Sequence, residues 1–410
     1  MKFRFRSLAL ILALALLLGL TPTVFAEEQI EIECFLIKVQ ALKVEEEIAA
    51  KFKEIHPNVT VRFVATPDAE TALFARIAAN EVPDIMNTYP AEVVYRQMMD
   101  DGLFVDLTGH EMLNNVSEAT LKLSEYDGKQ FALPTAMSSY GVFYNKDIFE
   151  KHGLAVPANY EELLTLCQAL QDAGELPIVF YDKSAGGVGQ MAERLMGILD
   201  NDSDGLFRKV AEGETDLVEK QPEVRELAEC MLKILEFGQK DQLGTDQDQA
   251  IADFVAGRAA MFIGGTWNVA TFMETNKDFN FAMFPFPNPM GTGETLPVNI
   301  DTSYSVYTGS KHVDMALEFV AFHSLPEIAQ MYADVEGSPN VIKGVNYNIE
   351  PLKPIDEVIK RGEMFLTPIN FWPPGMRSNW EQYIQQLFID KDVDYFVQTT
   401  QDMVHEFYNG

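Results

Sequence analysis

The sequence predicts an α/β protein, and two stretches of the chain carry that prediction. Near the start, a strand at 30–37 is followed by an amphipathic helix at 42–56 and a second strand at 59–63. This strand–helix–strand order implies parallel strands joined by a right-handed crossover. Further along, residues 253–268 contain the end of a helix, a stop at Gly257, and a short apolar strand that leads into a glycine pair.

The other elements follow from apolar spacing and from residues that end helices. In the first helix, Val44, Ile48 and Phe52 share one face, and Pro57 ends the element. Asn80 is expected in the left-handed conformation that ends the next helix. The remaining expected elements are strands at 83–87, 177–181, 279–284 and 303–308, and helices at 222–237, 311–323, 378–389 and 392–407.

Two residue pairs have the pattern of a capping box. In this motif a polar side chain at the helix start and a glutamate three residues later bind each other's backbone N–H groups. Asn159 with Glu162 predicts one helix start, and Ser378 with Glu381 predicts another.

Residues 1–26 have the pattern of a secretory signal peptide. Basic residues precede an apolar stretch at 8–20 that is short for a membrane span, and Ala26 closes a small-residue cleavage site. We therefore expect export to the periplasm or the cell exterior, with the mature chain beginning at Glu27. An uncleaved membrane anchor is the alternative. No cysteine directly follows the apolar stretch, so no lipid anchor is expected.

Net charge and cysteine content narrow the classes of partner. The 410-residue chain has a formal charge of −31, which repels nucleic acids and anionic lipids, so neither is an expected partner. Its length corresponds to roughly two or three folding units. The cysteines Cys34, Cys167 and Cys230 lie in apolar patterns and are expected to be buried thiols, although one pair could form a disulfide.

Patterns that could indicate cofactor, metal or catalytic chemistry are incomplete. Residues 187–192 match a dinucleotide-binding glycine motif, but they start late after the strand and lack the acidic residue that should follow. Asp200, Asp202 and Asp204 match the first half of a calcium loop, but Ala211 stands at its twelfth position, so this is a weak candidate metal site. The six histidines are scattered and no catalytic motif is present, so neither a cofactor nor enzymatic activity is expected.

Five segments, in order along the chain, resemble landmarks of one protein family. They are ARIAANEVPDIM, GKQFALPTAMSSYGVFYN, KDIFEKHGLAVPANYEELL, DFVAGRAAMFIGGTW and the region 337–345. The chain resembles the extracellular solute-binding proteins of ABC transporters, family 1, a maltose-binding-protein-like group. Asn80 replaces the glycine that is usual in the first segment.

The resemblance implies a two-lobed periplasmic-binding-protein fold. Each lobe would be a mostly parallel sheet flanked by helices, and the chain would cross the hinge three times. Lobe one would contain 27–136 and 279–325, and lobe two would contain 137–278 and 326–410. The resemblance also implies a monomer that captures a sugar or oligosaccharide between the lobes and delivers it to an ABC permease in the membrane.

Aromatic and polar residues at the ends of predicted elements are candidate ligand contacts. Sugars offer flat C–H faces to aromatic rings and hydroxyl groups to polar side chains. Trp267 follows the glycine pair at the carboxyl end of a strand, where ligands bind in open α/β sheets, and it matches the family's tryptophan position. The alternative is a core aromatic after a tight turn. The other candidates are Tyr140, Tyr89, Trp372, Arg377, Trp380, Gln40, Asp301 and Gly265.

Two further interpretations stay open on the sequence alone. The ligand could be a polyamine, a uronate or a metal chelate, and Arg377 between two tryptophans would suit an acidic sugar. From a different class, the chain could be an exported carbohydrate-active enzyme. With this many acidic residues, a catalytic carboxylate pair cannot be recognised from the sequence.

Overall fold

The computed structural model describes residues 28–66, 69–185, 187, 191–192, 195, 205–289, 296–336, 338–346 and 349–410, without the side chains of Gln40 and Glu336. These residues do not include the predicted signal peptide, the three aspartates of the calcium-like loop, or residues 188–190 of the glycine motif at 187–192.

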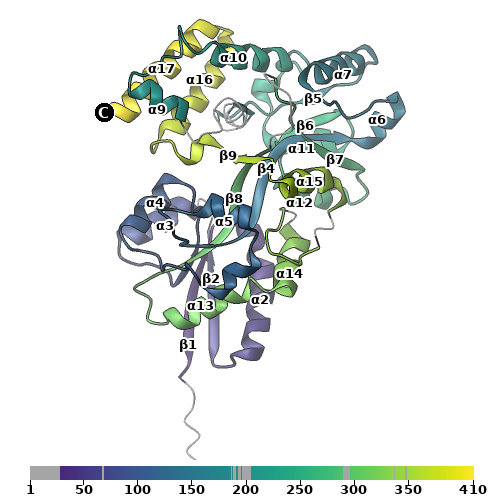
Figure 1. Cartoon of the computed structure of the whole chain (residues 1–410). Helices are drawn as coiled ribbons and strands as arrows, with labels where there is room; N and C mark the ends of the chain where they lie inside the picture. The colour runs from purple at the N-terminus through teal and green to yellow at the C-terminus, as the bar shows by residue number, and fades with distance from the viewer. Residues whose placement is uncertain are drawn as a thin grey trace, which may run out of the picture.

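The strands of the described residues form one mixed sheet of nine strands (Figure 1). Their order is β2-β1-β3-β8-β4-β6-β5, with β7 paired to β4 and β9 paired to β8. β1 pairs in parallel with both β2 and β3, as the strand–helix–strand order predicts. The strands are β1 Ile30–Leu36, β2 Val59–Ala65, β3 Ile85–Asn87, β4 Leu133–Asn145, β5 Ile178–Val179, β6 Met261–Gly265, β7 Phe281–Pro285, β8 Leu296–Val306 and β9 Met364–Leu366.

The 13-residue strand β4 is shared by the two halves of the sheet. Its first part, from Leu133 to Ser139, pairs antiparallel with β8, and its second part, from Tyr140 to Asn145, pairs antiparallel with β6 and β7. β4 therefore carries the chain from one lobe to the other. The sheet is mixed, whereas the sequence predicts mostly parallel sheets. β4 runs antiparallel to β6, β7 and β8, and β8 runs antiparallel to β3. Parallel pairing is found between β1 and β2, β1 and β3, β5 and β6, and β8 and β9.

Helices cover the sheet in two groups, which Figure 1 shows below and above the middle of β4. We call the part around β1–β3 lobe one and the part around β5–β7 lobe two. Lobe one carries α2 Leu42–Ile55, α3 Ala69–Ala78, α4 Val93–Asp100, α5 Glu118–Ser124, α13 Val313–Phe322 and α14 Pro326–Glu336. Lobe two carries α6 Lys146–His152, α7 Tyr160–Asp172, α9 Gly205–Ala211, α10 Pro222–Leu235, α11 Gln247–Val255, α12 Asn268–Thr275, α16 Met376–Asp390 and α17 Val393–Asn409.

Shorter segments connect these groups. α15 Lys353–Arg361 contacts β7 and β8 and lies between the lobes. The single-turn 3₁₀ helices are η1 Val39–Ala41, η2 Glu111–Asn115, η3 Gln242–Gly244, η4 Glu350–Leu352 and η5 Pro368–Asn370. In the part of the chain that the structure describes, no helix is long and apolar enough to cross a membrane.

Two elements fall on the other side of the lobe boundaries that the sequence predicts. The predicted boundaries place β7 in lobe one, but β7 pairs with the second part of β4, next to β6. They place α14 in lobe two, but α14 contacts α2 and η1 of lobe one. Apolar spacing identifies both elements correctly, but it does not show which sheet or helix they pack against.

Several local signals act as the sequence predicts. α2 ends at Ile55, Asn80 has a φ of 60°, and Gly257 takes a φ of 71° after α11. Cys34 and Cys167 are buried, Cys230 is partly buried, and all three thiols are free.

One of the two predicted helix starts is confirmed, with one difference from the ideal capping box. The Asn159 side chain accepts a hydrogen bond from the backbone N–H of Glu162 at 2.9 Å, and α7 begins at Tyr160. The Glu162 carboxylate accepts from the backbone N–H of Ala158, also at 2.9 Å. The second prediction is wrong, because Ser378 lies inside α16. That helix already begins at Met376, since Gly375 with a φ of 86° turns the chain and lets the Met376 side chain enter the core.

A cluster of polar side chains is buried inside lobe one. Glu45 of α2 has no exposed surface, and its Oε2 lies 3.0 Å from Nε2 of His323 at the end of α13. The Tyr304 hydroxyl donates to the other carboxylate oxygen, and Nδ1 of His323 lies 2.9 Å from the carbonyl oxygen of Phe319. Both side-chain oxygens of Glu45 therefore have a hydrogen-bond partner. These bonds offset the free-energy cost of burying its carboxyl group.

Candidate functional site

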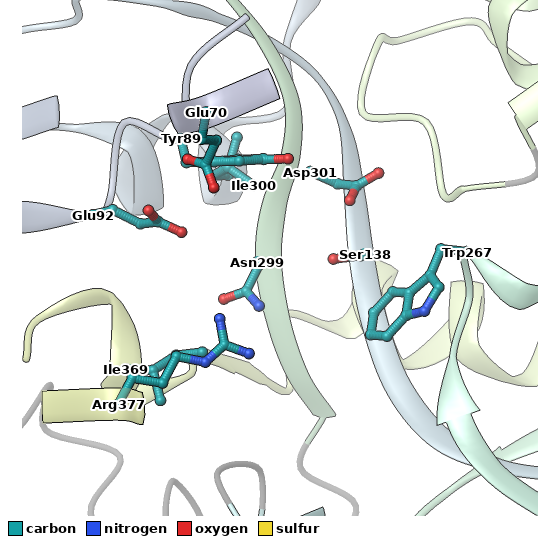
Figure 2. A pocket seen from close by; sticks show the side chains of 10 residues that line it. All are labelled: Glu70, Tyr89, Glu92, Ser138, Trp267, Asn299, Ile300, Asp301, Ile369 and Arg377. Carbon is teal, nitrogen blue, oxygen red and sulfur yellow. The ribbon is translucent and has the colours of Figure 1, made fainter. Parts of the chain in front are cut away.

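A pocket of about 250 Å³ lies between the two lobes, and both lobes line it. Lobe one contributes side chains from α3, from the connection between β3 and α4, and from the strands β4 and β8. Lobe two contributes the residue before α12 and the start of α16, and η5 adds a residue beside them. Figure 2 shows the ten lining residues: Glu70, Tyr89, Glu92, Ser138, Trp267, Asn299, Ile300, Asp301, Ile369 and Arg377.

The structure brings four of the candidate residues together in this pocket. Tyr89 and Asp301 line it from lobe one, and Trp267 and Arg377 line it from lobe two. These residues come from four separate regions of the sequence, and strand and helix ends bring them to one place.

Trp267 stands where β6 turns into α12, as its position after the glycine pair predicts. The ring lies directly over the backbone of Gly265: a Cβ on that glycine would be 2.0 Å from the nearest ring carbon. Behind it, the buried ring of Tyr140 has its centroid 6.3 Å from that of Trp267, at an angle of 36°. Gly265 and Tyr140 therefore support the tryptophan and do not line the pocket themselves.

Replacing Gly265 with alanine is expected to displace the Trp267 ring. The added methyl group would overlap three ring atoms, so the ring has to leave its position over the backbone. We expect the folded state to persist and the affinity for ligand to fall about tenfold, a loss typical of a misplaced aromatic contact. The measurement is calorimetric titration, with tryptophan fluorescence to report the moved ring. Unchanged affinity would show that the ring's position is not important for binding.

Trp372 and Trp380 are not in the pocket, contrary to the sequence-based expectation. Trp380 has no exposed surface and Trp372 is 4% exposed. The two rings meet edge to face at 5.0 Å between centroids, and Phe207 stacks on Trp372 at 5.3 Å. Both tryptophans therefore belong to the core of lobe two, where they anchor α16. The side chain of the last candidate, Gln40, lies outside the described parts.

Asp301 is held in place by lobe one. The Nζ atom of Lys38 donates to its Oδ2 atom, and the Ser338 hydroxyl donates to the same oxygen at 3.2 Å. The Lys38 and Asp301 side chains are only 9% and 11% exposed. The charge of Asp301 is therefore balanced before any ligand arrives.

The strands β4 and β8 supply two polar side chains, Ser138 and Asn299, that are not among the residues predicted from the sequence. The Asn299 Oδ1 atom accepts hydrogen bonds from the Thr367 hydroxyl and from the Asn370 amide, both at 2.7 Å. This leaves the Asn299 amide nitrogen to face the pocket, where Ser138 of β4 also points (Figure 2). Both residues sit in strands that consist mostly of buried residues. Polar residues at such positions are the signal that could have identified them.

Two glutamates, Glu70 and Glu92, complete the lobe-one wall and were also missed. The Tyr95 hydroxyl donates to Glu70 Oε1 at 3.0 Å. Burial raises the pKa of Glu92 to about 8, the charge of Glu70 acts in the same direction, and Arg377 lowers it. Near neutral pH Glu92 therefore keeps its proton, so it can donate a hydrogen bond as well as accept one.

Arg377 faces this wall from α16. Its Nε atom donates to Glu381 Oε1 at 3.1 Å, one helical turn further on. The pocket thus combines an aromatic ring with donors and acceptors from both lobes, an arrangement suited to a ligand rich in hydroxyl groups. In the described part of the chain, no group of three or more His, Cys, Asp or Glu residues could hold a metal ion. The weak candidate Asp200, Asp202 and Asp204 lies outside that part.

Comparison with known proteins identifies the family. Residues 47–353 match the family model of bacterial extracellular solute-binding proteins. The chain belongs to this family. A multiple sugar-binding protein from Streptococcus mutans is 24% identical over 337 residues, which cover 81% of this chain and 80% of the relative. The melibiose/raffinose/stachyose-binding protein MelE of Bacillus subtilis is 26% identical over a shorter stretch, 34% of this chain and 33% of its own length.

Solved structures show the same fold. The solute-binding protein RafE in complex with raffinose superposes with a TM-score of 0.79 at 24% identity, covering 92% of this chain and 99% of that one. The binding protein MsmE of Bacillus subtilis, described as an open conformation, has a TM-score of 0.77 at 16% identity and covers 92% of this chain and 97% of its own. These similarities confirm the predicted two-lobed α/β architecture.

Proposed function

We propose that this solute-binding protein captures a neutral oligosaccharide between its lobes and delivers it to an ABC permease. The observation that carries the proposal is the Trp267 ring, held over Gly265 and facing polar side chains from the other lobe. An aromatic face and hydroxyl-binding groups are what a pyranose ring needs. The names of the relatives, which bind raffinose, stachyose and related sugars, support the same class of ligand.

The charges around the pocket favour an uncharged sugar. Asp301 is paired with Lys38, and the raised pKa of Glu92 leaves it protonated near neutral pH. Glu70 and Arg377 then carry opposite charges on opposite walls. A uronate is disfavoured because Arg377 already binds Glu381 and faces Glu92. A polyamine is the second candidate, since ionised Glu70 and Glu92 would attract it at alkaline pH.

The same proposal assigns the protein its place in transport. The chain would be exported by the signal peptide at 1–26, act as a monomer, close its lobes around the sugar and present it to the membrane permease. It would perform no covalent chemistry. Binding between lobes favours the closed arrangement because only that arrangement lets the ligand contact both walls at once.

The test is a thermal-shift and calorimetric screen of residues 27–410 against raffinose, stachyose, maltotriose, galacturonate oligomers and spermidine. A ligand that binds only the folded state raises the melting temperature. We expect a shift with neutral oligosaccharides and a loss of affinity of about thirtyfold in Trp267→Ala, the size of a strong aromatic contact. Tyr395→Ala is the matched control, because Tyr395 is 53% exposed on α17 and does not line the pocket.

Other outcomes would contradict the proposal in different ways. A shift with spermidine alone would replace the sugar by a polyamine and keep the transport role. Equal affinity loss in the Trp267 and Tyr395 variants would remove the tryptophan from the site. Hydrolysis of an oligosaccharide during the titration would show that the protein is an enzyme.

A further inference from the structure

Arg96 of α4 lies between two aromatic rings, one from each side of the pocket. Its guanidinium carbon is 5.3 Å from the ring centroid of Tyr126 and 4.9 Å from that of Phe371. Tyr126 belongs to lobe one, on the connection between α5 and β4, whereas Phe371 lies between η5 and α16. A guanidinium this close to an aromatic face is attracted to it.

The contact between Arg96 and Tyr126 is supported by a hydrogen bond within lobe one. The Tyr126 hydroxyl donates to Asp100 Oδ2 at 2.8 Å, and Asp100 lies one helical turn after Arg96 on the same helix. Tyr126 is thus held against α4, the helix that carries Arg96. The contact between the Arg96 guanidinium and the Tyr126 ring therefore lies entirely within lobe one.

The other half of the contact is fixed by lobe two. The Phe371 backbone N–H donates to the carbonyl oxygen of Pro368 at 2.9 Å, and the next residue, Trp372, is buried in the core of that lobe. The Phe371 ring therefore moves with the start of α16. Figure 1 shows this start opposite α4, across the middle of the molecule.

A second pair of groups lies beside the first. Glu92 is the N-cap residue of α4 and lies four positions before Arg96 in the sequence. Glu92 interacts electrostatically with Arg377, which lies on α16, six residues after Phe371. The beginning of α4 thus interacts with the segment 371–377 at two points. Arg96 lies against the Phe371 ring, and Arg377 interacts with Glu92.

We propose that Arg96 is a positioning residue that holds the two lobes together by clasping Phe371, and so sets ligand affinity without touching the ligand. Arg96 and Phe371 are absent from the pocket lining. The inference rests on the proposed capture of a sugar between the lobes. A related structure is described as an open conformation, so the fold can separate its lobes. Separation would break the contact with Phe371 and keep the contact with Tyr126.

The test compares the wild-type chain with Arg96→Met and Phe371→Leu by small-angle X-ray scattering without ligand and by calorimetric titration with raffinose and stachyose. Both variants keep side-chain bulk and lose the cation or the ring. We expect a larger radius of gyration in the unliganded variants, because the closed arrangement becomes less populated. Affinity should fall by roughly two- to thirtyfold, the range that one cation–ring contact covers.

Two controls separate lobe positioning from general structure. Arg208→Met removes a similar contact, 5.9 Å from the Tyr408 ring, but α9 and α17 both belong to lobe two, so scattering and affinity should stay at wild-type values. Arg96→Lys keeps the charge and should recover most of both properties. If Arg96→Met does not fold, Phe371→Leu carries the same test from the other lobe.

The scattering measurement needs no ligand, so it distinguishes a failure of this inference from a failure of the sugar assignment. An unchanged radius of gyration in both unliganded variants would contradict the proposal that the contact between Arg96 and Phe371 holds the lobes together. A larger radius with unchanged affinity would overturn its role in capture.

Discussion

Replacing His323 with leucine is expected to lower the free energy of unfolding by about 3–5 kcal/mol. The substitution removes the partner that lies 3.0 Å from Oε2 of Glu45, and Glu45 has no exposed surface. Its carboxylate would keep only the hydroxyl of Tyr304 and could not reach water. Chemical denaturation followed by circular dichroism measures the change.

The control for this prediction removes the whole cluster. Glu45→Met, Tyr304→Phe and His323→Leu together remove the buried carboxylate along with both of its partners. The Phe319 carbonyl loses its bond to His323 in the single and the triple variant alike. The triple variant should therefore be more stable than the single His323 variant. Buried ion pairs replaced by apolar residues of similar size often cost little. Additive losses would mean that the three side chains act independently and that the cost lies in packing.

Replacing Asp182 with asparagine is expected to change how stability depends on pH. Asp182 follows β5, is 4% exposed, and its Oδ2 atom has no hydrogen-bond partner among the described residues. Burial raises its pKa to about 7 from an ordinary value of 3.8. Between these two values the folded protein holds a proton that the unfolded chain has released, so wild-type stability falls as the pH rises through this range.

The expected change in the free energy of unfolding is about 4 kcal/mol, from roughly three pKa units at about 1.4 kcal/mol each. Relative to wild type, the Asp182→Asn variant should therefore gain stability from pH 4 to pH 8, with most of the gain complete just above pH 7. Urea denaturation at a series of pH values measures it. Asp278→Asn, on an exposed position, is the control and should give a constant difference. A constant difference for Asp182 as well would contradict the raised pKa.

Local signals in the sequence predict much of the fold because they depend on neighbouring residues. Gly257 and Asn80 end helices as expected, and the Asn159 capping box starts α7. Pairing across the sheet depends on residues far apart in the chain. The sequence therefore could not show that β7 joins the second part of β4, or that α14 packs on α2.

The candidate site also contains residues that the sequence can predict and residues that it cannot. Trp267 is predictable because its glycine neighbour leaves room for the ring. Trp372 and Trp380 look equally suitable in the sequence, but their rings pack against Phe207 and each other inside lobe two. Glu70 and Glu92 look like ordinary charges near helix starts. Only the approach of α3 and α4 to α16 shows that they face the pocket.

The place of β8 in the sheet has a consequence for how the chain is made. β8 lies between β3 and β4, although about 150 or more residues separate it from either strand in the sequence. The ribosome must therefore synthesise about three quarters of the chain before β8, the middle strand in the order β2-β1-β3-β8-β4-β6-β5, is available. Pairing between such distant segments slows folding. A chain that stays unfolded during synthesis can still be threaded through a membrane channel, which a prematurely folded domain could not be.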